Sequence, residues 1–101
     1  MAQKLGILVC TNKYLDYVIR TAEAAHRKGL DIQIFFTGQG VLLTQEPRFK
    51  ELVDHARLYV CDVSFRANEL EGEVPGVGFK QFVTQARNAE MIEECDRYLV
   101  F

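Results

Sequence analysis

The sequence has few of the residues that build metal centres or disulfide frameworks. Its 101 residues include three cysteines, Cys10, Cys61 and Cys95, and two histidines, His26 and His55. No two cysteines are spaced as CxxC, and no cysteine and histidine as CxxH. An odd number of cysteines argues against a disulfide framework. A zinc site would need ligands gathered from distant segments. We therefore expect neither a metal nor a cofactor.

Strong charge of one sign and long apolar runs are also lacking. The net charge is −2, and the lysines and arginines are scattered, so the chain is not expected to bind nucleic acid. The longest apolar runs are too short to cross a bilayer. Residues 1–4 lead directly into an apolar run, without the apolar core and cleavage site of a signal peptide. We therefore expect a cytoplasmic protein with no membrane span.

Short apolar runs alternate with amphipathic stretches along the whole chain. The apolar fraction is 49%, which is typical of a globular protein, and the length allows one domain with one core. The alternation predicts a single α/β domain over residues 1–101, a three-layer α/β/α sandwich that is flavodoxin-like in outline. Its sheet is mainly parallel, with about five strands. The strand order stays open. Strands are predicted at residues 5–10, 31–36, 58–61, 79–83 and 98–101.

The amphipathic stretches predict four helices, and small polar residues stand where three of them begin. Thr11 and Asn12 can cap the first helix, Ser64 a short helix that ends near residue 70, and Thr84 the last helix. Another helix is predicted from about residue 47 to 56, with Pro47 in its first position. The last helix is expected to turn one stripe towards the sheet, namely Ala86, Ala89, Ile92 and, continuing it, Cys95.

In a parallel sheet the carboxyl ends of the strands meet at one edge, where α/β proteins build their sites. Cys61 ends the third predicted strand and immediately precedes a helix. The thiolate is the reactive form of cysteine, and a helix start lowers the pKa of a thiol. Arg66 could add positive charge, whereas Asp62 would disfavour a thiolate. The alternative is that Cys61 is only the last buried residue of a strand.

Two further features lie at the same predicted edge. Cys10, with Thr11 and Asn12, ends the first strand; if that strand neighbours the third, Cys10 and Cys61 could form a reversible disulfide. A buried structural cysteine is the favoured alternative. The loop Gly38-Gln39-Gly40 could cradle an anion. It matches neither common phosphate-binding motif, so a tight turn is favoured.

Four short segments, in order and at compatible spacing, carry a family resemblance. They are the opening strand at residues 4–9, the strand and G-x-G-V loop at residues 34–41, the cysteine turn of Cys61 with Ser64 and Arg66, and the closing strand at residues 95–101. Together these segments resemble the DsrE/DsrF-like family, which includes the TusD-type sulfur-relay subunits.

The resemblance implies a three-layer fold that assembles as a homo-oligomer or with related family subunits. It also implies that Cys61 accepts a persulfide sulfur and passes it on, with sulfur donor and acceptor proteins as partners. Two alternatives remain open. One is a thiol redox sensor using Cys10 and Cys61. The other is a non-catalytic module that binds a small molecule or a protein, suggested by the apolar run Val41-Leu42-Leu43 after the glycine loop.

Overall fold

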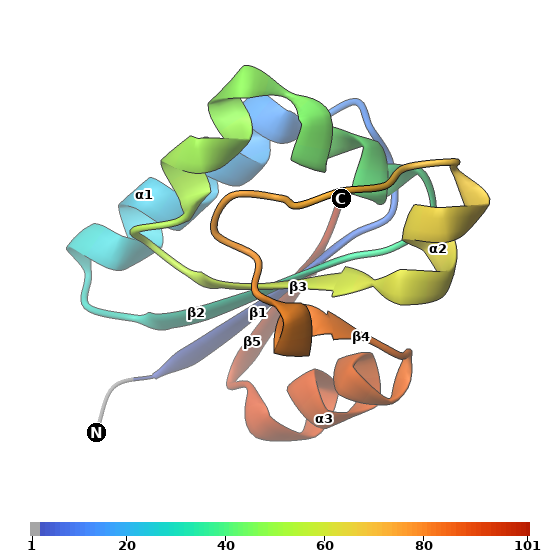
Figure 1. The fold of residues 1–101 in the computed structure, drawn as a ribbon. Coiled ribbons are helices and arrows are strands. Elements are labelled where there is room, and N and C mark those ends of the chain that lie inside the picture. Colours follow the sequence, from blue (N-terminus) through green and yellow to red (C-terminus); the bar gives the residue numbers. More distant parts are fainter. Residues whose placement is uncertain (1–2) are drawn as a thin grey trace.

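The computed structural model describes residues 3–101 and contains one parallel sheet (Figure 1). Its five strands lie in the order β4-β3-β2-β1-β5, and every neighbouring pair is parallel. The α/β fold with a five-stranded parallel sheet is therefore confirmed. The strands are β1 (Lys4–Val9), β2 (Asp31–Phe36), β3 (Arg57–Cys61), β4 (Phe82–Val83) and β5 (Arg97–Val100).

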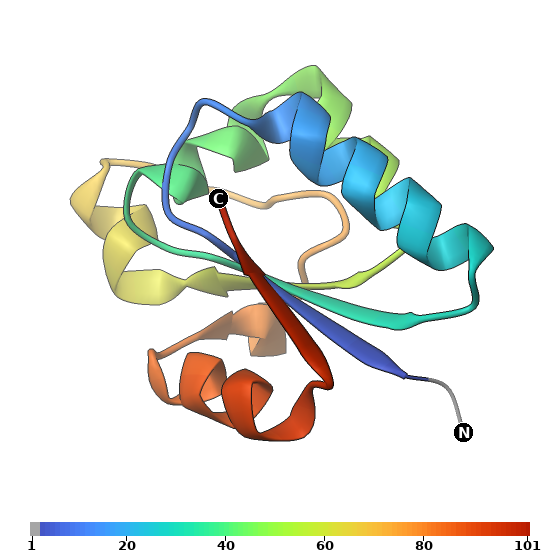
Figure 2. The same ribbon diagram turned by 180° about the vertical axis from the view of Figure 1, so that it is seen from behind.

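Helices cover both faces of the sheet. One face carries α1 (Leu15–Arg27) and two 3-10 helices, η1 (Gly38–Gln45) and η2 (Pro47–Leu52), as Figure 1 shows. The other face carries α3 (Ala86–Glu94), seen below the sheet in both ribbon views (Figure 2). A short helix, α2 (Asp62–Ala67), extends from the end of β3. The layers follow the flavodoxin-like outline, although flavodoxin itself has the strand order 2-1-3-4-5.

The larger core lies between the sheet and the layer formed by α1, η1 and η2. Side chains alternate between the two faces of a strand, so every second residue of β1, β2 and β3 enters this core. From α1 it receives Val18, Ile19, Ala22 and Ala25, which lie on one face of the helix and are all buried. Val41 and Leu43 are also buried in it, so the apolar run after the glycine loop forms core and not a free surface.

A smaller core lies on the opposite face, beneath α3. Its buried residues are Phe35, Cys61 and Met91, with Tyr59 and Cys95 among the partly buried residues packed around them. Cys61 therefore points towards the α3 layer. Among residues 3–101, no helix is long and apolar enough to span a membrane.

The helix starts differ from the predicted ones. Tyr14 precedes α1 without a side-chain cap, so Thr11 and Asn12 do not cap that helix. Cys61 itself is the N-cap of α2, which makes Ser64 the third helical residue. Strand β3 runs directly into this helix, so no separate capping residue fits between them. Before α3 the cap is Gln85, while the neighbouring Thr84 hydroxyl accepts a bond from the backbone of Ala86 at 3.3 Å.

Three other predictions were wrong in extent or orientation. The helix expected at residues 47–56 is only η2, and the strand expected at residues 79–83 is reduced to β4 by η3 (Phe79–Gln81). Of the expected inner stripe of α3, Ala86, Ala89 and Ile92 face solvent, with Ile92 55% exposed, whereas Cys95 packs against the smaller core as expected. The helix is turned so that Met91 and Arg87 face the sheet instead. A partly buried arginine is not anticipated by an apolar pattern, and here the Arg87 guanidinium lies over the Tyr59 ring, 4.7 Å from its centroid.

Candidate functional site

The candidate site is the thiol of Cys61, where β3 passes into α2. Pairing with Val83 of β4 holds its backbone on one side. β2 lies on the other side of β3 and is paired with it as far as Phe36 and Val60. The Cys61 sulfur accepts a hydrogen bond from the backbone N–H of Ser64 at 3.5 Å. The residue is only 4% exposed. The thiol thus lies at the carboxyl edge of the sheet, as predicted, but it is buried.

Three polar side chains from three different parts of the chain surround the sulfur. Ser64 comes from α2, Thr37 follows β2 and Gln85 precedes α3, and all three side chains lie close enough to the thiol to lower its pKa. They also bind one another. The Gln85 amide donates to the Thr37 hydroxyl at 2.7 Å, and the Thr37 and Ser64 hydroxyl oxygens lie 3.4 Å apart. The sulfur is therefore enclosed by a connected network of neutral hydrogen-bond donors.

The network changes the acidity of the thiol. Burial raises the pKa of Cys61, but hydrogen bonds from the Ser64 side chain, the Ser64 backbone, Gln85 and Thr37 together outweigh it, so the pKa lies below the ordinary value for cysteine. The pKa of Cys95 is shifted the other way, by burial and by the nearby Glu94 carboxylate. At a given pH a larger fraction of Cys61 than of Cys95 is therefore ionised. The thiolate is the more nucleophilic form, so it is more populated at Cys61 than at Cys95.

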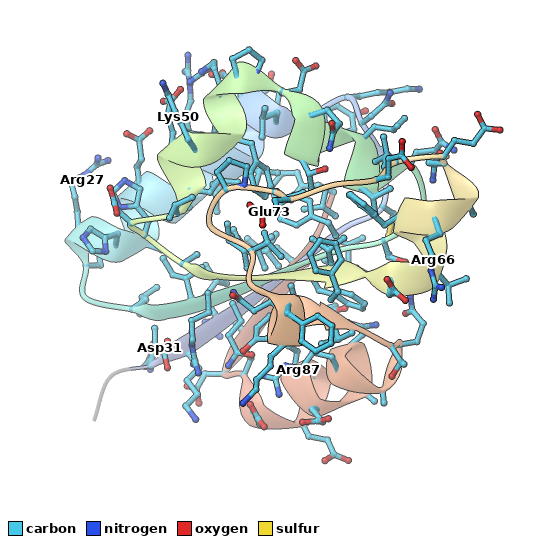
Figure 3. All side chains as sticks on the ribbon, viewed as in Figure 1. Arg27, Asp31, Lys50, Arg66, Glu73 and Arg87 are labelled. Carbon is cyan, nitrogen blue, oxygen red and sulfur yellow. The ribbon has the colours of Figure 1, made fainter. Side chains whose placement is uncertain are left out.

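Arg66 and Asp62 do not act on the thiol as the sequence suggested. The Arg66 guanidinium forms an ion pair with the Asp62 carboxylate one helical turn away. Figure 3 shows Arg66 on the outer side of α2. The pair cancels most of the negative charge that Asp62 would otherwise present to a thiolate. The acidity of Cys61 is therefore set by neutral donors.

The glycine loop supports this site and is not an open anion cradle. Gly38 has a φ of +54°, and its N–H donates to the Ser64 hydroxyl at 3.0 Å. The N–H of Gly40 is bonded to the Thr37 carbonyl at 2.9 Å. Gln39 is exposed and donates to Asn68 of the α2 end at 3.3 Å. The amides of both glycines are thus occupied, and the loop is tied to α2.

The residues that follow β1 are not brought to Cys61. β2 lies between β1 and β3, which places Cys10 and Cys61 two strand spacings apart, about 10 Å. That separation exceeds the Cα distance that a disulfide spans, and all three cysteines are free. The Thr11 hydroxyl is buried without a partner, and Asn12 is exposed. The structure therefore removes the basis for a redox sensor built on Cys10 and Cys61.

Sequence reasoning placed the loop that begins at Thr37 at this edge without assigning Thr37 to the thiol, and it missed Gln85. Thr37 follows β2 directly and Gln85 lies two residues beyond β4, so both stand at the carboxyl edge of the sheet. That edge rule is the signal that could have found them. The histidines lie elsewhere: the rings of His26 and His55 are in contact, with centroids 4.6 Å apart and a tilt of 42°, next to the end of α1 and the start of β3. Within residues 3–101 no three potential ligands are gathered as a metal ion would require.

Fold and site together define a small α/β protein that holds a hydrogen-bonded thiol at the carboxyl edge of a parallel sheet. The chain belongs to the DsrE/DsrF-like family, whose model matches residues 3–101. This family is associated in general with sulfur relay. Among solved structures, the fold is similar to that of the ychN protein from E. coli, with a TM-score of 0.77, 16% identity and coverage of 100% of both chains. No curated protein sequence matches the chain.

Proposed function

We propose that the protein is a sulfur carrier and that Cys61 is its acceptor. The observation that carries the proposal is the hydrogen-bond network of Ser64, Thr37 and Gln85, which lowers the pKa of this one thiol. The general association of the DsrE/DsrF-like family with sulfur relay supports the same chemistry.

The transfer is an exchange between sulfur atoms. The Cys61 thiolate attacks the outer sulfur of a donor persulfide, R–S–SH. A bond forms between the Cys61 sulfur and that outer sulfur, the donor S–S bond breaks, and the donor leaves as R–S⁻. The proton stays on the transferred sulfur, so Cys61 becomes Cys–S–SH. An acceptor thiolate then attacks the outer sulfur, and Cys61 is released as its thiolate. No outside oxidant or reductant is consumed.

This chemistry needs nucleophilicity and access, and it proceeds without a metal or an organic cofactor. The partners we propose are a sulfur donor protein and a sulfur acceptor protein in the cytoplasm, where thiols stay reduced. We also propose assembly with further copies of the chain or with related family subunits. The apolar side chains of Leu99 and Val100 are exposed on the edge strand β5, which supports such contacts.

Incubation with glutathione persulfide followed by intact-mass measurement tests the proposal. The expected result is the addition of one sulfur atom to the wild-type protein and none to Cys61→Ala. Cys10→Ala and Cys95→Ala are matched controls and should load like the wild type. Unmodified wild-type protein, or loading that survives Cys61→Ala, would contradict the proposal.

A second candidate is a protein-binding module without thiol chemistry. The sequence suggested such a module because of the apolar run after the glycine loop, but Val41 and Leu43 of that run are buried. Phe79 supports the module instead. This ring is 93% exposed and borders a cavity of about 770 Å³ lined by residues 72–79, 81 and 82. Aromatic residues are enriched at protein–protein interfaces, so an exposed ring beside a cavity is suited to contact with a partner. The pH dependence of Cys61 alkylation separates the two candidates: a midpoint at the ordinary thiol pKa favours the module, and a lower midpoint favours the carrier.

A further inference from the structure

The Cys61 sulfur is covered, although sulfur transfer requires a donor to reach it. We propose that Gln85 is a positioning residue: its side chain covers the thiol while hydrogen-bonded to Thr37, and it must turn away before a persulfide donor can attack. This inference rests on the proposed sulfur-carrier function, because only that function requires the thiol to be reached.

The geometry places Gln85 directly across the sulfur. Gln85 follows β4, which pairs with the end of β3 through Val83 and Cys61. Its amide nitrogen donates to the hydroxyl of Thr37, which follows β2, on the other side of β3. This bond joins residues 48 positions apart in the chain and passes over the strand end that carries the thiol. The same side chain lies close enough to the sulfur to lower the pKa of Cys61.

The Gln85 side chain can move while the helix behind it stays in place. α3 is anchored to the sheet by Met91, which is fully buried, and by Arg87, whose side chain is 17% exposed. The Arg87 guanidinium lies over Tyr59 and donates to the buried Gln33 amide oxygen; Figure 3 places Arg87 on the α3 side of the sheet. Gln85 itself is exposed, so its side chain can rotate into solvent on the nanosecond scale.

Removal of the Gln85 amide is expected to have two opposite effects on Cys61. It uncovers the sulfur, which raises the rate at which the thiolate reacts. It also removes one hydrogen bond that favours the thiolate, so ionisation requires a higher pH. The other titratable or charged groups nearby lie on elements that this substitution leaves intact: Asp62 paired with Arg66 on α2, Tyr59 beneath Arg87, and Cys95 and Tyr98 in the same cluster.

The test is alkylation of the full-length protein by iodoacetamide over a range of pH, followed at each cysteine by peptide mass spectrometry. For Gln85→Ala we expect the plateau rate of Cys61 at high pH to rise at least threefold and the midpoint to move to higher pH. Gln39→Ala is the matched control, because Gln39 is an exposed amide in the adjacent loop that donates to Asn68. It should change neither quantity.

Both changes are required for the inference to stand. A plateau rate that stays the same or falls, or a midpoint that does not rise, overturns it. A parallel rise at Cys95 also overturns it, because that rise would mean general loosening of the α3 layer. Glutathione persulfide loading is measured separately. If the wild type takes up sulfur but the plateau alkylation rate of Cys61 is unchanged in Gln85→Ala, only the role of Gln85 is refuted. If that plateau rate rises in Gln85→Ala but the wild type takes up no sulfur, only the sulfur-carrier function is refuted.

Discussion

Of the glycines, Gly40 is the one with least room for a side chain. It lies in η1 against the end of β1, and a Cβ atom there would lie 2.2 Å from the Val9 carbonyl oxygen and 2.8 Å from the Val9 carbonyl carbon. Carbon and oxygen atoms in close contact are normally about 3.3 Å apart or more. In Gly40→Ala the loop and the strand must therefore separate by about 1 Å, on the basis of that contact distance.

The loss of folding stability comes from disturbing the packing and the hydrogen bonding of Val9. Forcing one extra carbon into a packed region costs about 1–3 kcal/mol. The Val9 carbonyl also accepts a hydrogen bond from the backbone of Thr37 at 2.9 Å, and weakening that bond adds about 0.5–1.5 kcal/mol. The lower entropy of alanine in the unfolded chain offsets about 0.4–1 kcal/mol. We expect the free energy of unfolding to fall by about 2–3 kcal/mol, a large share of the roughly 5–15 kcal/mol of a typical domain.

Urea unfolding followed by circular dichroism measures this loss, with Gly72→Ala as the control. Gly72 has a φ of +87° but no atom within 4 Å of its Cβ position, so its substitution introduces backbone strain without a clash. That strain costs about 1–2 kcal/mol. A loss for Gly40→Ala of less than about 1 kcal/mol, or no larger than that for Gly72→Ala, would refute the steric argument. Because Thr37 is bonded to both Val9 and Gln85, the same variant should also raise the pKa of Cys61.

Two further predictions concern the α3 layer and the thiol. Met91→Ala should lower the free energy of unfolding by about 2–5 kcal/mol in urea titrations, because Met91 is fully buried beside Phe35 and Cys61; a loss below about 1 kcal/mol would show loose packing there. The folded-state pKa of Cys61 lies below its unfolded value, so its ionisation contributes stability that is fully present above the unfolded pKa and is lost as the pH falls through the folded pKa. The stability difference between the wild type and Cys61→Ala should therefore grow as the pH rises through that window, and a difference that is independent of pH would contradict it.

Local sequence patterns were sufficient to predict the helices and strands in which apolar residues recur with a clear period. The apolar runs of β1 and β2 predict strands buried on both faces, and the 3.6-residue stripe of α1 predicts which of its residues enter the core. The position of Cys61 at a strand end also follows from local pattern, because the apolar run stops there and a helix begins.

The orientation of α3 could not be predicted in the same way. Its stripe of Ala86, Ala89 and Ile92 is apolar, but the sheet beneath it offers Tyr59 and Gln33 as partners for Arg87 and a pocket for Met91. A helix packs against a sheet with the face whose side chains best complement those of the sheet. Which side chains the sheet presents beneath the helix is known only once the strands are paired.

The sequence by itself therefore determined the fold class, most of the strands and the position of Cys61 at the edge of the sheet, because these depend on residues close together in the chain. Only the tertiary structure decided the strand order, which separates Cys10 from Cys61, and the surroundings of the thiol. Thr37 and Gln85 meet across 48 residues. Contacts at that separation leave no local periodicity, since they arise from the pairing of β2, β3 and β4 into one sheet.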